Sequence, residues 1–175
     1  MLRSLSRSDG RAARGGLKLF LVLVYVLVGA VATGGHADAT GETVDIAVVV
    51  HPGVPADDVS FAELRRIMLG DQKFWRRGEP ITLLVRAPVA RERTVVLEKI
   101  CKMSEAGFRK HWIGKVFRAE TTSGPKVVLS SVMAVELVRV LPGAVALIIV
   151  GEVPEDVKVL RIDGRLPGDP DYALR

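Results

Sequence analysis

The chain has a single cysteine, Cys101, and only 5% of its 175 residues are aromatic. One thiol cannot close an intramolecular disulfide, which excludes the disulfide-stapled class of small secreted domains. Cys101 stands beside Ile100 and one turn after Leu97, so it is interpreted as a small apolar residue of the core. His51 and His111 have no companion Cys or His at a metal-ligand spacing, so no metal site is predicted.

Catalytic motifs are also missing. The chain contains no Gly-x-Ser-x-Gly turn and no His-Glu-x-x-His helix, and no cysteine is placed as an activated nucleophile. The stretch from Thr122 to Lys126 does not complete the phosphate-loop pattern Gly-x-x-x-x-Gly-Lys-Ser/Thr. The sequence therefore predicts a protein that is not an enzyme and that uses no cofactor.

The first 39 residues have the three parts of a secretory signal peptide. Five basic residues precede an uncharged apolar run, Leu19 to Ala32, and the small-residue pattern Ala37-Asp38-Ala39 follows it. We expect cleavage after Ala39, with Ala32 as the second choice, and hence a periplasmic protein. The alternative is a retained anchor, but the run is shorter than the roughly 20 apolar residues that usually span a bilayer.

Removal of this segment changes the net charge. Five of the 25 basic and two of the 20 acidic residues lie before Thr40, so 20 basic and 18 acidic residues remain and the net charge falls to about +2. A domain with so small an excess of positive charge has no electrostatic signature of nucleic-acid binding. No nucleic acid is expected among its partners.

Four apolar runs rich in β-branched residues predict strands: Val44 to Val50, Ile81 to Val85, Ala144 to Val150 and, as a weaker strand at an edge, Val157 to Ile162. A helix is predicted to begin after Ser60, with Glu63 completing a capping box, and to end at Gly70. Further helices are predicted over Glu92 to Met103, after Ser104, and from Ser130 or Ser131 through Leu141. Strands that alternate with helices favour an α/β fold: a mainly parallel sheet with helices on both faces.

Four segments of the chain contain recognisable motifs, and the order in which they follow one another is informative. They are IAVVVHPGVP (46–55), SFAELRRIMLGDQKFWRRGEPITLLVR (60–86), FRKHWIGKVFRAETTSGPKVV (108–128) and SSVMAVELVRVLPGAVALIIV (130–150). In this order they resemble the phosphate-binding-protein-like domain of periplasmic solute-binding proteins, those similar to the substrate-binding subunit of the phosphate ABC transporter. The resemblance implies a single three-layer lobe of the type II periplasmic-binding-protein-like fold over residues 40–165, followed by a loose tail over 166–175.

The chain differs from this family in two segments and in its length. Arg86 stands at the strand-terminal Arg of the family, but the Ser-Gly-Thr-type loop that follows it in phosphate binders is replaced by Ala87-Pro88-Val89-Ala90. The Gly-Tyr-Val after Pro-Gly-Ala-Ile is replaced by Ala146-Leu147-Ile148. The chain is also about one lobe long, whereas full binders close two lobes over the ligand.

Ligands of open α/β sheets bind beyond the carboxyl ends of the strands, where helix N-termini offer free N–H groups. This rule and the resemblance together select the candidate oxyanion-binding residues Arg86, Arg91, Arg93, Thr94, Thr122, Ser123, Ser130 and Ser131, with Thr121 beside them. Arg86 alone is carried over directly from the family. The competing interpretation is that Ser130 and Ser131 are plain helix caps and that the arginines form a solvated face.

Two functions remain open. The first is a solute-binding protein that binds phosphate or a similar oxyanion non-covalently. Self-association would complete its binding cleft, and its protein partner would be an ABC transporter permease or another envelope protein. The second is an interaction or sensor module that docks on an envelope protein and whose anion site has decayed. Loss of the Ser-Gly-Thr loop favours the second, and the basic residues and helix caps at the expected end favour the first.

Overall fold

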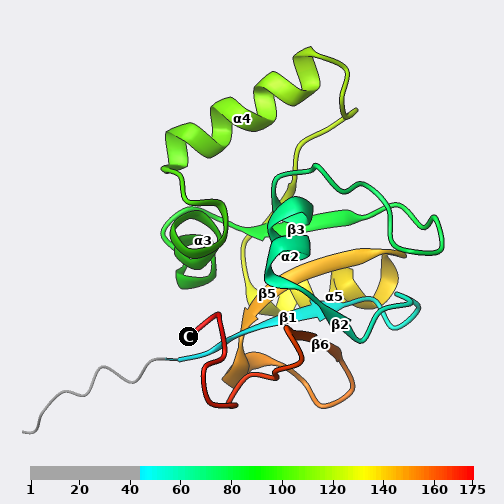
Figure 1. The fold of residues 1–175 in the computed structure, drawn as a ribbon, viewed down its shortest axis with the longest axis vertical. Helices are drawn as coiled ribbons and strands as arrows, with labels where there is room; N and C mark the ends of the chain where they lie inside the picture. The colour runs from blue at the N-terminus through cyan, green and yellow to red at the C-terminus, as the bar shows by residue number, and fades with distance from the viewer. Residues whose placement is uncertain (1–43) are drawn as a thin grey trace, which may run out of the picture. The chain divides into compact units, whose positions relative to one another are not determined.

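Six strands form one sheet in this computed structural model, which describes residues 44–175 (Figure 1). They are β1 (Ile46–Val50), β2 (Asp58–Val59), β3 (Thr82–Arg86), β4 (Lys126–Val128), β5 (Ala144–Ile149) and β6 (Lys158–Ile162). Their order across the sheet is β2-β6-β1-β5-β3-β4. The predicted signal peptide and its cleavage site lie outside the described residues.

Five of the six strands point the same way, because β3 is parallel to β4 and β5, β2 is parallel to β6, and β1 is antiparallel to both β5 and β6. The carboxyl ends of those five strands therefore meet at one end of the sheet, which we call the carboxyl end. The expectation of a mainly parallel sheet is confirmed with one exception, the central strand β1. An apolar run predicts a buried strand but carries no information about its direction.

The helices are α2 (Phe61–Met68), α3 (Arg91–Val95), α4 (Glu105–Phe117) and α5 (Ser131–Val140), with a π-helical turn η1 (Val96–Cys101) and a 3-10 turn η2 (Val150–Glu152). Elements α2, α3 and η1 pack on one face of the sheet and α5 packs on the other, each over its own apolar core. Helices on both faces are thus confirmed. Figure 1 shows α4 set apart from the sheet and joined to β4 by a long connection. Within residues 44–175, no helix combines the length and the apolar character needed to cross a membrane.

Serine caps begin three of the helices, as predicted. The hydroxyl oxygens of Ser60, Ser104 and Ser130 each accept a hydrogen bond, 3.1 Å long, from the backbone N–H of the residue three positions later. The second half of the Ser60 capping box differs, because the Glu63 carboxylate accepts from Gln72 Nε2 instead of reaching back to the cap. The predicted helix over 92–103 is divided into α3 and η1, and Cys101 is buried in the core together with Leu97 and Ile100, as predicted.

Gly70 follows the end of α2 with φ +69°, a conformation that costs a residue with a Cβ atom about 1–2 kcal/mol. A Cβ atom at this position would lie 2.4 Å from the Trp112 ring. Glycine here therefore serves two purposes: it turns the chain after α2 and lets the indole of α4 pack against the backbone.

Two predictions at the end of the chain were wrong. Strand β6 does not lie at the edge of the sheet, because the two-residue strand β2 pairs with its outer side. The segment over 166–175 is not loose: Tyr172 and Leu174 are buried, the Tyr172 hydroxyl donates to the Ile46 carbonyl at 2.9 Å, and the Leu174 carbonyl accepts from Ile46 N–H. Apolar side chains and backbone hydrogen bonds thus fix this segment beside β1, and residues 44–175 belong to one compact unit.

Candidate functional site

Arg86 ends β3 at the carboxyl end of the sheet, and its side chain is only 16% exposed. Its Nε donates to Glu92 Oε1 at 3.1 Å, and the same carboxylate oxygen accepts from Ser131 Oγ at 3.3 Å. Glu92 lies in the first turn of α3 and is 2% exposed, and Ser131 is the first residue of α5. One strand end and two helix N-termini thus meet at a buried cluster, which we call the Arg86 cluster.

The guanidinium of Arg86 is not fully satisfied. Its Nη1 is buried and has no hydrogen-bond partner among the atoms of residues 44–175. Buried donors in folded proteins are nearly always paired, so each exception needs an explanation. An acceptor oxygen carried by a ligand would satisfy this donor. The negative charge of Glu92, held next to the same guanidinium, would compete with such a ligand.

Arg93 is the next residue along α3, but it belongs to a different environment. Its Nε and Nη2 donate to the two carboxylate oxygens of Glu105 at 3.0 and 2.7 Å, and its guanidinium lies over the Phe108 ring, 4.6 Å from the centroid. The Arg93 hydrogen bonds hold the pKa of Glu105 below its ordinary value. The guanidinium of Arg93 thus contacts two residues of α4, and Arg93 is not part of the Arg86 cluster.

The other predicted site residues are dispersed. Arg91 and Thr94 are exposed, and Ser130 caps α5 beside Ser131. Thr122 and Ser123 are exposed in the loop that precedes β4, where the Thr121 hydroxyl donates to the Ser123 carbonyl at 3.0 Å. Since β4 runs parallel to β3, this loop lies at the opposite end of the strands from Arg86. Of the eight candidates, the structure brings together Arg86 and Ser131, with Ser130 next to them.

Sequence reasoning missed the partner that joins them, Glu92. An acidic residue in the first turn of a helix is favoured by the helix dipole alone, which conceals any further role. The available signal was its spacing: it follows the strand-terminal Arg86 by six residues, across a short loop that contains Pro88.

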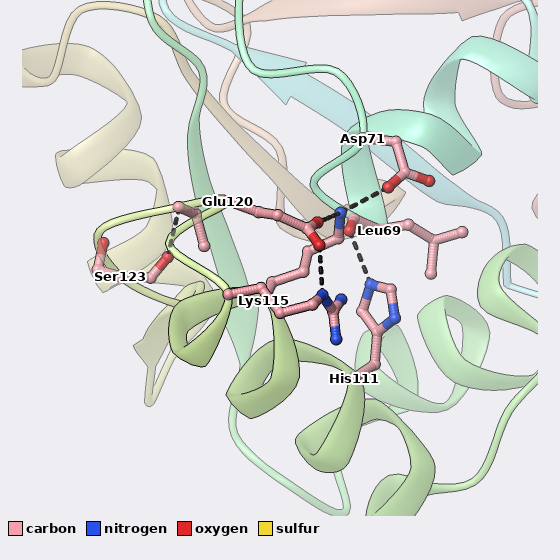
Figure 2. A network of polar contacts seen from close by, with 8 residues as sticks. Leu69, Asp71, His111, Lys115, Glu120 and Ser123 are labelled. Atoms are coloured by element: carbon pink, nitrogen blue, oxygen red, sulfur yellow. Dashed lines mark hydrogen bonds and ion pairs between the residues drawn. The ribbon is translucent and has the colours of Figure 1, made fainter.

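A second polar network, shown in Figure 2, fixes α4. The ammonium of Lys115, 6% exposed, donates to Asp71 at 2.7 Å and to Glu120 at 3.0 Å, and His111 Nε2 lies 2.8 Å from the Leu69 carbonyl oxygen. Arg118 also pairs with Glu120. Hydrogen bonds from Arg118 and then Lys115 lower the pKa of Glu120 to about 2, and the contact with Asp71 raises the pKa of Lys115. All its charges are neutralised within the network, so it is a structural support.

A groove of about 460 Å³ runs between α4 and β4. Its walls are mostly apolar, with Phe108, Ile113, Val116 and Phe117 from α4 facing Val127 of β4, and Arg86 does not line it. Among residues 44–175 there is no cluster of three or more His, Cys, Asp or Glu side chains that could hold a metal ion.

No protein-family model matches the chain, and no curated protein matches it. Several solved structures are similar to it, including the following three. One is described as a phosphate ABC transporter substrate-binding protein with bound phosphate, from Clostridium perfringens; it is 19% identical, the TM-score is 0.56, and the match covers 69% of this chain and 46% of that one.

The second solved structure is an ABC-type phosphate transport receptor from Vibrio cholerae, 18% identical, with a TM-score of 0.56 over 71% of this chain and 48% of that one. The third is PstS from Borrelia burgdorferi, 11% identical, with a TM-score of 0.59 over 75% and 54%. The likeness confirms the predicted fold. The chain spans about half the length of the structures that it matches.

Proposed function

Because the chain has the fold of phosphate ABC transporter substrate-binding proteins, over about half their length, we propose that it is a periplasmic solute-binding protein without enzymatic activity. Its ligand is phosphate or a related oxyanion, bound non-covalently at the Arg86 cluster. The proteins that it resembles are described as phosphate binders, and this fold places ligand contacts beyond the carboxyl ends of the strands.

The observation that carries the proposal is the unpaired Nη1 of Arg86. A guanidinium presents its donors in a planar fork, and a tetrahedral oxyanion offers acceptor oxygens at a matching spacing. Glu92 fixes the orientation of this fork through Nε, so that the remaining donors keep their direction. The N-terminus of α5 lies beside the cluster and adds positive dipole character.

The test is a thermal-unfolding titration with sodium phosphate, sulfate and chloride at constant ionic strength. A ligand that binds only the folded state raises Tm by mass action, so phosphate at about 10 mM should raise Tm more than chloride does. The double variant Arg86→Met/Glu92→Gln should lose this shift. It removes both partners of the buried pair and is therefore expected to fold better than a variant that leaves one charge unpaired.

Arg77→Ala is the matched control, because Arg77 is exposed and precedes β3 at the end opposite to Arg86. It should keep the phosphate shift of the wild type. The proposal fails if phosphate and chloride act alike on the wild-type protein, or if the double variant responds to phosphate as the wild type does.

A specific observation also favours the second function, an envelope interaction module with a decayed anion site. The carboxylate of Glu92 already occupies Arg86 Nε and Ser131 Oγ, so the cluster contains an anion of its own. In that case neither wild type nor Glu92→Gln responds selectively to phosphate, and the function lies on another surface, such as a contact with a permease or with a second copy of the chain.

A further inference from the structure

The groove between α4 and β4 is an apolar surface that the fold itself does not use. The side chains of Phe117, Ile113 and Val127 are 87%, 50% and 53% exposed, although all three line the groove. Val89 after β3 and Leu129 after β4 are also exposed apolar residues. Contiguous apolar patches of this kind mark interaction sites on soluble proteins.

Helix α4 carries two apolar faces. Phe108 and Trp112 are buried, with their rings edge to face at 6.2 Å, and Trp112 packs against Gly70. Ile113, Val116 and Phe117 have the spacing i, i+3 and i+4 and form a second stripe that stays exposed. A helix needs one apolar stripe to pack on its own domain. The second stripe is therefore available to another molecule.

The groove is held open by contacts that do not involve this second stripe. Lys115 of α4 pairs with Asp71 and Glu120, and Glu105 of α4 pairs with Arg93 of α3 (Figure 2 shows the first of these). Arg93 also stacks on Phe108 at the base of the helix. Because these contacts fix the wall, an occupant meets a preformed surface and loses less entropy on binding.

The charge of the groove selects the chemistry of its occupant. Two guanidinium groups, Arg93 and Arg109, and one carboxylate, Glu105, line it, which leaves one net positive charge. Arg93 is neutralised by Glu105, whereas Arg109 is exposed and forms no ion pair within residues 44–175. Two copies related by a two-fold axis through the groove would bring two Arg109 side chains together. A partner with carboxylates complements this rim instead.

We propose that the α4–β4 groove is a docking surface for an acidic, apolar segment of a partner protein. Its apolar side chains pack between α4 and Val127, and a carboxylate pairs with Arg109. The thirteen residues of α4 extend over about 20 Å, a length that about six residues of extended chain span. Arg86 does not line this groove, so the proposal of a docking surface does not depend on whether an oxyanion binds at the Arg86 cluster.

Fluorescence anisotropy with two synthetic peptides tests the proposal. Both are fluorescein-labelled and about eight residues long, one alternating Leu with Glu and the other alternating Leu with Lys. The acidic peptide should bind the wild-type protein, and the basic peptide should bind at least about tenfold more weakly. Phe117→Ser should weaken the acidic peptide at least about tenfold, as expected for a central aromatic anchor. Arg109→Glu should reverse the preference between the two peptides.

Two matched variants serve as controls. Val140→Ser removes an exposed apolar side chain from α5, and Arg161→Glu reverses an exposed charge on β6, so neither touches the groove. Both should bind the acidic peptide as the wild type does. Equal binding of the two peptides, or unchanged binding by Phe117→Ser, overturns the proposal. A wild-type dimer in sedimentation that Ile113→Asp dissociates also overturns it, because the occupant is then a second copy.

Discussion

The Arg86 cluster and the α4–β4 groove each include one residue of α3, Glu92 and Arg93, and they differ in how many of their groups the fold itself pairs or buries. In the cluster, a partly buried arginine, a buried carboxylate and a serine hydroxyl are joined by hydrogen bonds, and the buried Nη1 of Arg86 has no partner within residues 44–175. In the groove, the charges of Arg93 and Glu105 are paired, whereas a stripe of apolar side chains stays exposed. The cluster thus contributes to stability and keeps a charged donor for a small ligand, whereas the groove contributes little to stability and offers an apolar surface.

Among the predicted changes in the free energy of unfolding, we expect the loss of Arg86 from the cluster to give the largest. Arg86→Ala leaves the carboxylate of Glu92 buried without its charged partner, and the loss of one member of a buried pair costs about 3–5 kcal/mol. Urea unfolding measures the free energy of unfolding of this variant. Arg86→Met/Glu92→Gln should lie closer to the wild type. A loss below about 1 kcal/mol in Arg86→Ala would mean that the pair contributes no more than a surface ion pair does.

Gly70→Ala tests the support of the groove. The residue has φ +69° and no room for a Cβ atom beside Trp112, so the backbone conformation and the overlap together should cost about 2–4 kcal/mol. Urea unfolding checks this value. Gly78→Ala is the matched control, since Gly78 also has a positive φ but nothing lies near its Cβ position. An equal loss in both variants would show that the contact with Trp112 adds nothing.

Glu92→Gln sharpens the comparison at the Arg86 cluster. The amide keeps an oxygen acceptor for Arg86 and Ser131 but removes a negative charge, so the affinity for phosphate should rise about tenfold. Isothermal titration calorimetry measures this change. Glu98→Gln is the control, because Glu98 is an exposed acid on the neighbouring η1 turn. An unchanged affinity in Glu92→Gln would show that Glu92 does not compete with the ligand.

Acid should weaken the support of α4. Arg118 and Lys115 lower the pKa of Glu120 to about 2, from an ordinary value of 4.5. A carboxyl whose pKa is lower in the folded state stabilises at pH above its unfolded value, and that contribution is lost as the pH falls toward 2. Urea midpoints at about pH 6 and about pH 3 should therefore differ less in Glu120→Gln than in the wild type. The same pH dependence in both proteins would contradict a role for Glu120.

The smallest effect is expected in the groove. Phe117→Ser should change the free energy of unfolding by less than about 0.5 kcal/mol, because the ring is almost fully exposed. Phe108→Ala, on the buried face of the same helix, should cost about 3–5 kcal/mol. Urea unfolding of the two variants distinguishes the buried face of α4, which stabilises the fold, from its exposed face, which does not. A loss above about 1 kcal/mol in Phe117→Ser would place that ring in the core.

The parts of the fold that the sequence predicted are those encoded locally. Runs of β-branched residues predicted β1, β3, β5 and β6, and serines predicted the starts of α2, α4 and α5. Strands β2 and β4 have two and three residues and exist because a longer neighbour pairs with them, so no period was present to detect. The direction of β1 depends on its pairing with β5, about 100 residues away, and the packing of Tyr172 on Ile46 joins residues 126 positions apart.

The candidate site was predicted less completely. Arg86 was found by its position at a strand end and by resemblance, whereas Glu92 was hidden in the first turn of a helix, where acidic residues are common for another reason. Arg93 was selected for its charge, but its partner Glu105 lies on another helix. Charge alone does not distinguish an arginine that meets a ligand from one that is neutralised by a distant carboxylate.

Glu92 and Arg93 are consecutive residues of α3, a helix of five residues. Glu92 holds Arg86 on one side, and Arg93 holds Glu105 and Phe108 on the other. The two contacts are made by adjacent residues of one helical segment, which continues into η1, so a displacement of this segment acts on both. We therefore expect the two regions to be thermodynamically linked: if an anion at Arg86 changes the affinity of the groove for a partner, the partner changes the affinity for the anion by the same factor.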